Sequence, residues 1–289
     1  MFDAVLILVG VFGLGVAYFS FRAGGFWVLL GVLALVCEAL LVYGSLIEPR
    51  TIRVTRYREP LVPQPKTWIS IALLTDMHAG SFKDASWFSR MSREVSALRP
   101  DVVLFDGDAV VDKADPVMDL ASLSDIQSPL GKFFVLGNHD LVDRPQDIRA
   151  AFISFGFKDL TNVSVHLEKQ GGVVELQGID DLWYGKPTVV RRSSANTPHV
   201  TLSHEADLLL DLKEKQTDLV LSGHTHGGQV YLPILGPLWP VPTFLGRGMC
   251  RGRIIKHGVP AIISNGLGES DGRMRLFTPP EIVVVEIGV

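Results

Sequence analysis

Two long apolar runs near the N-terminus constrain the fold of this chain more than any other feature of its sequence. Residues 2–21 carry one charge at their edge, and residues 26–47 carry one, Glu38. Each run has about 20 residues, and a helix that rises about 1.5 Å per residue needs that length to cross a hydrocarbon core of roughly 30 Å. Because only residues 22–25 separate the runs, the sequence predicts a transmembrane helical hairpin over residues 1–49.

A cleaved signal peptide is the alternative interpretation of the first run. It is disfavoured because no basic residues precede the run and a second full-length apolar run follows directly. Glu38 lies near the middle of the second run, where a carboxyl group is costly unless it is paired, protonated or packed against another helix. Its role is either a contact with a lipid headgroup or a proton, or packing between the two helices.

The positions of the arginines predict the side of the membrane on which the rest of the chain lies. Arg22 is the one basic residue between the two runs, whereas four arginines follow the second run closely. These four are Arg50, Arg53, Arg56 and Arg58. Basic residues favour the cytoplasmic side, so we expect an inner-membrane protein with two spans, the bilayer as a partner and a cytoplasmic C-terminal domain.

Charge and cysteine content exclude two other classes of protein. The net charge of −4 provides no basic footprint for nucleic acid. The two cysteines, Cys37 within the second run and Cys250 far along the chain, suggest neither a disulfide framework nor a zinc site built from thiolates.

After the second run the chain divides into a linker and one domain. Residues 50–68 are rich in Arg and Pro and are predicted to form a juxtamembrane linker with a short strand at 51–57. Residues 69–289 form the domain. Its first half alternates apolar strands with segments of helical apolar spacing, which predicts an α/β layered domain. The strands are expected at 69–75, 101–105 and 132–136, and the helices at 84–98 and 116–126.

The second half of the domain has mostly short strands. They are predicted at 173–177, 200–203, 219–222, 229–232, 253–256, 261–264 and 282–287. Helices are predicted only at 144–155 and 206–213. A second sheet packed on the first, with helices outside, accounts for both halves, so the expected fold is an α/β two-sheet sandwich flanked by helices.

Polar residues follow five predicted strands at the point where each strand ends, which is where α/β sheets collect functional groups. They are Asp76 and His78 in TDMH, Asp106 and Asp108 in FDGD, Asn138, His139 and Asp140 in GNHD, His204 after VTLS, and His224 and His226 in SGHTH. Each fragment alone is weak, since GNHD also suits an ordinary turn. Together, carboxylates, imidazoles and an amide without a thiolate suit Mn²⁺, Fe²⁺ or Zn²⁺, and their number predicts two ions.

The motifs D-x-H, G-D, G-N-H-D, a lone His after a strand, and G-H-T-H resemble those of the calcineurin-like metallophosphoesterase family, in order, from about residue 69 to residue 289. The resemblance implies two packed sheets with flanking helices. It implies one metal held by Asp76, His78 and His226, and another held by Asn138, His204 and His224. It also implies that Asp108 bridges the two metals and that His139 is the catalytic histidine, which stabilises or protonates the departing oxygen.

The implied ligand set agrees with the chemistry of phosphoryl transfer, which needs positioning and charge neutralisation more than covalent help. Two ions roughly 3.5–4 Å apart can share a hydroxide and hold the phosphoryl oxygens for in-line displacement. An anionic carboxylate at position 108 lowers the repulsion between the ions, and a neutral amide at position 138 keeps the site cationic. Mn²⁺ is the ion expected first, with Fe²⁺ or Zn²⁺ as alternatives.

Further segments are similar to the membrane-anchored bacterial branch of this family. They are VTRYREPL, LSHEAD, SGHTHGGQVYLPILGPL, SNGLGES and RMRLFTPPEI. Some members of this branch hydrolyse UDP-2,3-diacylglucosamine at its pyrophosphate in lipid A synthesis, and others are general phosphoesterases. The resemblance therefore implies a lipid-linked phosphorylated substrate.

A tethered phosphodiesterase or phosphatase for soluble nucleotides or phosphoproteins is the alternative enzyme, and a non-catalytic membrane scaffold is the alternative of another class. Met77 departs mildly from the branch, which has another apolar residue such as Leu.

Several residues have two possible interpretations. Asp106, Asp112 and Asp140 either orient ligands from outside the metal shell or form turns. Arg273 and Arg275 either clamp a substrate phosphate or form a solvated pair.

The apolar, proline-rich residues 231–244 either contact acyl chains or the bilayer, or simply pack over the site. His166, His199 and His257 are expected to be structural. His224 and His226, two apart, are expected to face one cleft from an extended segment.

Overall fold

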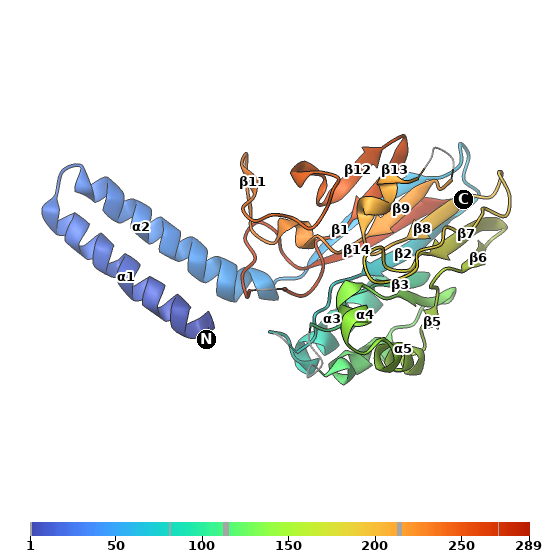
Figure 1. The fold of residues 1–289 in the computed structure, drawn as a ribbon, viewed down its shortest axis with the longest axis horizontal. Helices are drawn as coiled ribbons and strands as arrows, with labels where there is room; N and C mark the ends of the chain where they lie inside the picture. The colour runs from blue at the N-terminus through green and yellow to red at the C-terminus, as the bar shows by residue number, and fades with distance from the viewer. Residues whose placement is uncertain (1, 81, 112–115, 213–215, 271) are drawn as a thin grey trace.

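A computed structural model describes residues 2–80, 82–111, 116–212, 216–270 and 272–289. Two N-terminal helices, α1 (Phe2–Ala23) and α2 (Trp27–Val42), lie side by side and stand out from the rest of the molecule as an arm (Figure 1). A π-helical turn and a 3₁₀ turn extend α2 to Arg50. Leu6–Ala23 and Trp27–Arg50 are long and apolar enough to be membrane spans.

The remainder contains two six-stranded sheets. The order in the first sheet is β1 (Arg53–Pro60), β14 (Glu281–Gly288), β2 (Trp68–Leu74), β3 (Val102–Asp106), β4 (Gly131–Val135) and β5 (Lys158–Asp159). The order in the second is β12 (Gly252–Lys256), β13 (Val259–Ile263), β9 (Leu219–Ser222), β8 (His199–Leu202), β7 (Gly172–Gly178) and β6 (Ser164–Lys169). The predicted two-sheet α/β sandwich is confirmed.

Alternation along the strands explains how the sheets pack, because successive side chains of a strand point to opposite faces. In β2, Ile71 and Leu73 belong to the core between the two sheets, together with Leu221 of β9. Ala72 and Leu74 face the other side, where helices cover the first sheet. A strand buried on both faces has a continuous run of apolar residues, which is why β2 could be predicted from the sequence.

The helices that cover the first sheet include α3 (Ala85–Leu98) and α5 (Pro145–Ser154). Helix α3 begins at an N-cap, because the side chain of Asp84 accepts a hydrogen bond from the amide of Trp87 at 3.0 Å. It ends at Leu98, because the next residue, Arg99, has a left-handed backbone and precedes a proline that cannot continue the helix.

Two predicted helices have a different form. Residues 116–126 were predicted to be a helix and contain a 3₁₀ segment, Val117–Asp125. Residues 206–213 were predicted to be a helix, and a 3₁₀ segment ends at Leu210, with Lys213 outside the described residues. In both segments leucines reach the core after only one or two turns, so packing rather than helix propensity determines the form.

Strands β1, β5, β6 and the β10–β11 hairpin differ most from the sequence prediction. Residues 50–68 were predicted to be a linker with a short strand, and β1 pairs with β14 over its full length as the edge of the first sheet. Strands β5 and β6 were not predicted. The predicted strand 229–232 is reduced to β10 (Tyr231–Leu232), which pairs with β11 (Gly236–Pro237) in a small hairpin.

Phe152 of α5 is the centre of an aromatic cluster on the outer face of the first sheet. Its ring centroid lies 4.3 Å from that of Phe105, 5.3 Å from that of Phe134 and 5.4 Å from that of Phe157. The next residue, Ile153, is 58% exposed. The cluster therefore allows a test of how α5 is held.

We predict that Phe152→Ala lowers the free energy of unfolding by about 3–5 kcal/mol, because it removes a buried ring and leaves a cavity. Ile153→Ala on the exposed face of the same helix should change it by less than about 0.5 kcal/mol. Denaturant unfolding followed by circular dichroism measures both. Equal effects of the two substitutions would contradict the packing of α5 described above.

Candidate metal centre

The carboxyl ends of β2, β3, β4, β8 and β9 meet at one edge of the sandwich, and the seven predicted metal ligands lie there. All seven side chains are at most 9% exposed. Six of them form two groups. Within each group, the candidate ligand atoms lie within 4.8 Å of one another. The groups are Asp76 with His78 and His226, and Asp108 with His204 and His224.

In the first group, nitrogen and oxygen atoms converge on one point. The Nε2 atoms of His78 and His226 lie 3.0 Å apart, and the two rings are stacked. Oδ1 of Asp76 lies 3.5 Å from Nε2 of His226. Two imidazole nitrogens at this distance must share a proton or a cation, and nitrogen and carboxylate oxygen are the ligand types that divalent transition metals take.

In the second group, Asp108 lies between the two sets of histidines. Its Oδ2 is 3.2 Å from Nε2 of His204 and 3.8 Å from Nε2 of His78. Oδ1 of Asn138 and Nε2 of His224 are buried, and neither has a hydrogen-bond partner among the described residues. Buried polar atoms without partners are costly, so these unsatisfied atoms fit a cation.

Backbone carbonyls orient two of the histidines predicted to be ligands. Nδ1 of His204 lies 2.5 Å from the carbonyl oxygen of Asp106, and Nδ1 of His226 lies 3.3 Å from that of Gly268. When Nδ1 donates to a carbonyl, Nε2 keeps its lone pair and points inward, which is how ligand imidazoles are oriented in metal sites.

The electrostatics of the site also fit a cation. Burial lowers the pKa of His78 to about 3 and that of His224 to about 4, and it lowers the pKa of His226 well below the usual value. These imidazoles are therefore neutral, as metal ligands must be. Burial alone would also lower the pKa of His204, but the carboxylates of Asp108 and Asp76 raise it well above the usual value. The two carboxylates thus favour positive charge between them.

Five of the seven predicted ligands have a left-handed backbone, which residues other than glycine rarely adopt. The φ angles are 50° at Asp76, 44° at His78, 58° at Asp108, 67° at His224 and 49° at His226. Strain of this kind concentrates at functional sites. The expectation of an extended segment at 224–226 was wrong. A left-handed turn leading into the 3₁₀ segment His226–Gly228 sends the two rings into different groups.

Glycines 223 and 137 leave room for the ligands. A Cβ atom at position 223 would collide with the side chains of Thr75 and Asp76, and one at position 137 would collide with Asp108 and His204. Any larger residue at either position would displace a ligand.

Asp106, Asp112 and Asp140 were predicted either to orient ligands from outside the metal shell or to form turns. Asp140 holds the loops after β3 and β4 together. Its carboxylate accepts hydrogen bonds from the amides of Asp108, Ala109 and Gly137, at 2.8, 2.8 and 3.1 Å. Asp106 orients His204 through its backbone carbonyl rather than its side chain. Asp112 lies outside the described residues.

Arg275 is fully buried, so both earlier interpretations, a phosphate clamp and a solvated pair, are wrong for it. Its guanidinium donates to the carbonyls of Asn265, Thr278 and Gly268 and to the carboxylate of Glu269. Arg273 lines a separate cleft, described below. Of the three histidines expected to be structural, His199 is buried, whereas His166 and His257 are exposed.

A cavity of about 640 Å³ opens beside the two groups. Asp108, His139 and His224 contribute to its polar side, and Trp183, Trp239–Pro242 and Met274 to its apolar side. The ring of His139 lies 5.1 Å from that of His78. Trp183, which packs edge-on against His224 at 4.5 Å, was missed because it lies in an irregular segment without a motif.

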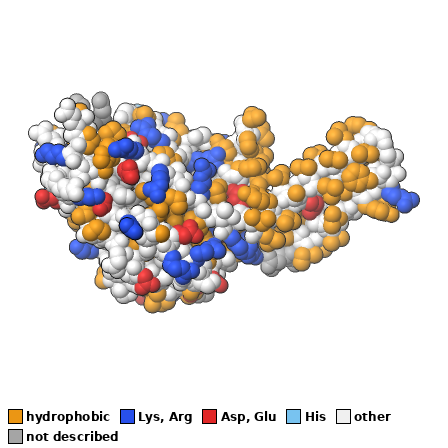
Figure 2. Space-filling model, turned by 180° about the vertical axis from the view of Figure 1, so that it is seen from behind, with side chains coloured by type: hydrophobic (Ala, Val, Ile, Leu, Met, Phe, Trp, Pro, Cys, Tyr) orange, Lys and Arg blue, Asp and Glu red, His pale blue; other side chains and the backbone are white. Residues whose placement is uncertain are grey.

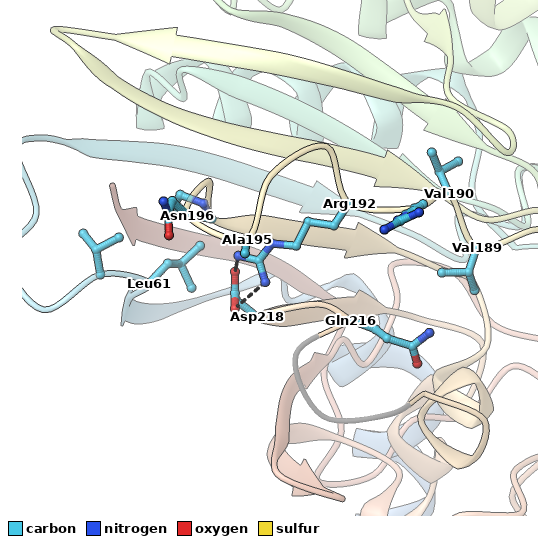
Figure 3. A pocket seen from close by; sticks show the side chains of 11 residues that line it. Leu61, Val189, Val190, Arg192, Ala195, Asn196, Gln216 and Asp218 are labelled. Carbon is cyan, nitrogen blue, oxygen red and sulfur yellow. Dashed lines mark hydrogen bonds and ion pairs between the residues drawn. The ribbon is translucent and has the colours of Figure 1, made fainter.

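A second cavity of about 660 Å³ lies away from these residues (Figure 3). Arg192 crosses it and pairs with Asp218 at 2.7 Å, and it also donates to the carbonyl of Thr197. None of the predicted ligands lines this cavity. The chemistry therefore concentrates in the cavity at the strand ends.

Buried carboxylates and neutral imidazoles beside a cavity suit a metal centre, and the comparisons with known proteins give the reaction class. Residues 69–228 match the family model of the calcineurin-like phosphoesterases. The chain belongs to this family and is a metal-dependent phosphoester hydrolase.

Three relatives illustrate the range of similar proteins. The chain is 27% identical to the uncharacterized metallophosphoesterase YkuE of Bacillus subtilis (strain 168), over 84% of this chain and 87% of the relative. It is 30% identical to the phosphodiesterase YaeI of Escherichia coli (strain K12), over 69% and 76%. It is 26% identical to the UDP-2,3-diacylglucosamine pyrophosphatase LpxG of Chlamydia muridarum (strain MoPn / Nigg), over 84% and 92%.

We predict that His226→Ala lowers the amount of bound Mn²⁺ and reduces the rise in thermal unfolding temperature that Mn²⁺ produces, because binding to the folded state stabilises it. His166→Ala, at an exposed histidine that contacts Ser193, is the matched control and should change neither. Metal analysis after dialysis and thermal scans with and without Mn²⁺ measure the effects. Full metal content in His226→Ala would contradict its assignment as a ligand.

Proposed function

We propose that the chain is a dinuclear phosphoesterase of the inner membrane, with Asp108 bridging two divalent ions. One ion would be held by Asp76, His78 and His226, and the other by Asn138, His204 and His224. The single observation that carries this proposal is the position of the Asp108 carboxylate between two ligand groups. Two divalent ions bound there would supply an activated water and would neutralise charge on the phosphoryl oxygens. The mixed oxygen and nitrogen ligands suit Mn²⁺, which we propose first, and also Fe²⁺ or Zn²⁺.

His139 is proposed as the residue that stabilises or protonates the departing oxygen. Its ring lines the cavity and is partly exposed, unlike the seven ligands. Its backbone amide donates to Oδ1 of Asp108 at 3.0 Å, which holds the residue beside the metal groups while leaving the ring free to reach substrate.

We predict that His139→Asn lowers kcat by about 10²–10⁴-fold, the usual contribution of a positioned acid, without lowering the metal content. Steady-state kinetics on a soluble aryl phosphodiester and metal analysis of the same sample measure both. A parallel loss of metal would show that His139 acts as a ligand instead.

The proposed substrate is a phosphorylated molecule linked to lipid, such as UDP-2,3-diacylglucosamine. The cavity supports this because it joins a polar side at the metal groups to an apolar side built by Trp183, Trp239–Pro242 and Met274. The two apolar helices would hold the enzyme at the bilayer. We propose a cytoplasmic orientation, based on the arginines that follow α2.

A phosphodiesterase for soluble nucleotides is the second candidate, and the similarity to the phosphodiesterase YaeI supports the type of bond but not the nucleotide. Hydrolysis of a phosphopeptide would be a variant of this second candidate function. The apolar side of the cavity distinguishes these candidates, because a nucleotide or peptide substrate does not require it.

We predict that the full-length protein with Mn²⁺ hydrolyses UDP-2,3-diacylglucosamine faster than a cyclic nucleotide or a phosphopeptide. Val241→Asn should raise KM for the lipid substrate several-fold and leave KM for a soluble aryl phosphodiester unchanged, because the side chain lines the apolar side only. A panel of these substrates, assayed in mixed micelles, measures the ratios. Equal effects of Val241→Asn on both substrates, or a preference for the cyclic nucleotide, would refute the lipid proposal.

A further inference from the structure

The loop of residues 231–244, here called the apolar loop, exposes large apolar side chains to solvent. Ile234 is 104% exposed, Phe244 is 81% exposed and Leu235 is 70% exposed. Leu238 and Trp239 are about half exposed, and the loop contains no charged residue. A contiguous apolar surface of this kind marks a site of contact with a membrane or a protein.

The base of the apolar loop is firmly held. Oδ1 of Asp207 accepts hydrogen bonds from the hydroxyl of Thr243 at 2.7 Å and from the amide of Phe244 at 2.9 Å. At the other end, the guanidinium of Arg251 lies 3.5 Å from the centre of the Tyr231 ring. The tip is thus displayed by a fixed scaffold, and its exposure is a property of the fold.

The tip contains a residue that is unfavourable for a loop in water. Leu232 pairs with Gly236, so residues 233–235 form the turn of the hairpin. Ile234 adopts a φ of 75° there. Glycine or asparagine adopts this conformation readily, whereas a β-branched residue does not. An isoleucine that is both strained and fully exposed is explained if its side chain enters an apolar phase.

The apolar loop lies next to the end of the helical arm. The amide of Tyr231 donates to the carbonyl of Leu276 at 2.9 Å, and the amide of Arg275 donates to the carbonyl of Gly44, at the end of α2, at 2.8 Å. The loop that carries β11 projects from the domain beside the base of the arm in Figure 1, and Figure 2 shows an apolar projection at the same place from behind.

Cationic side chains surround the same junction. A cleft of about 720 Å³ at the end of the arm is lined by more basic than acidic side chains. They are Arg50, Lys83, Arg90, Arg93 and Arg273, against Asp84, Asp119 and Glu269. Figure 2 shows Lys and Arg side chains gathered near the base of the arm. Basic residues beside a membrane span attract anionic headgroups, so the charge at this junction is complementary to a bilayer surface.

We propose that the tip of the apolar loop, Ile234 and Leu235, inserts into the lipid bilayer beside α2. Because the same loop supplies Trp239–Pro242 to the metal-site cavity, insertion places the apolar side of that cavity at the membrane surface. This inference rests on the proposed membrane location of the arm and does not depend on the identity of the substrate. The tip is a membrane contact rather than a contact with a second copy of the chain.

Nitroxide labelling of the full-length chain in vesicles of phosphatidylcholine and phosphatidylglycerol tests the insertion. Cys37 is replaced by Ala, and Cys250 is buried and can remain. Labels are placed one at a time at Leu235→Cys, at Leu14→Cys in α1 and at Ile153→Cys on α5, away from the arm. Collision rates with oxygen, which concentrates in lipid, and with a water-soluble nickel chelate are then compared. For each label we take the ratio of the oxygen collision rate to the nickel collision rate. We expect this ratio for the label at residue 235 to be closer to the ratio at residue 14 than to the ratio at residue 153.

Three outcomes would overturn the inference, and they are distinguishable. A label at 235 that is as accessible to nickel as the label at 153, with the label at 14 in lipid, refutes insertion alone. A label at 235 shielded from both reagents indicates a protein partner. A label at 14 that is in water refutes the membrane location as well, whereas metal-dependent hydrolysis would remain testable with a soluble ester.

A second variant separates insertion from folding. Ile234→Asn suits the left-handed turn, so its unfolding temperature in detergent should be equal to or higher than that of the unmodified chain. In vesicles it should shift the label at 235 toward water and leave hydrolysis of a soluble ester unchanged. Ile153→Gln is the matched control and should leave the label at 235 unmoved. An unchanged position of the label in Ile234→Asn would overturn the role assigned to this residue.

Discussion

The structure depends on holding two carboxylates, Asp76 and Asp108, out of water at the meeting point of two sheets. A buried carboxylate is costly unless it is paired and hydrogen-bonded. Asp76 accepts a hydrogen bond from the amide of His224 at 3.0 Å, and Asp108 accepts one from the amide of His139 at 3.0 Å. Each carboxylate thus joins the loop after its own strand to the loop after another. The bonds that stabilise these charges also bring together the side chains that supply the chemistry.

The elements with a clear physical signal were predictable from the sequence. Strands β2 and β3 are buried on both faces and therefore appear as unbroken apolar runs. Helix α3 carries a cap at Asp84 and a regular apolar stripe. The ligands were visible because they follow such strands directly. The structure brings Asp76, Asp108 and the histidines into two groups, in the arrangement that the family resemblance implied, although their roles as metal ligands stay a proposal.

Features set by tertiary contacts were not predictable. The left-handed turn at His224 and His226 depends on the space beside Gly223 and on the Asp76 carboxylate, which no local pattern reveals. Strand β1 lies in a segment rich in Arg and Pro, and only its pairing with β14 makes it part of the sheet. The partners of Arg275 lie only three to ten residues away along the chain, but the guanidinium meets their carbonyl and carboxylate oxygens only after this irregular segment has folded around it.

The end of the helical arm is connected to the metal groups by a short series of buried contacts. Glu48, 2% exposed, accepts hydrogen bonds from the amides of Phe277 and Thr278. The carbonyl of Thr278 accepts one from Arg275, and Arg275 also donates to the carbonyl of Gly268.

That carbonyl of Gly268 is also the partner of Nδ1 of His226. The links through Thr278, Arg275 and Gly268 are buried, so breaking one of them would leave an unsatisfied polar group. The end of the arm is therefore linked by hydrogen bonds to a residue of the candidate metal centre. Because His226 is oriented from the side on which the arm leaves the domain, the metal groups, the cavity and the apolar loop keep one orientation relative to the arm.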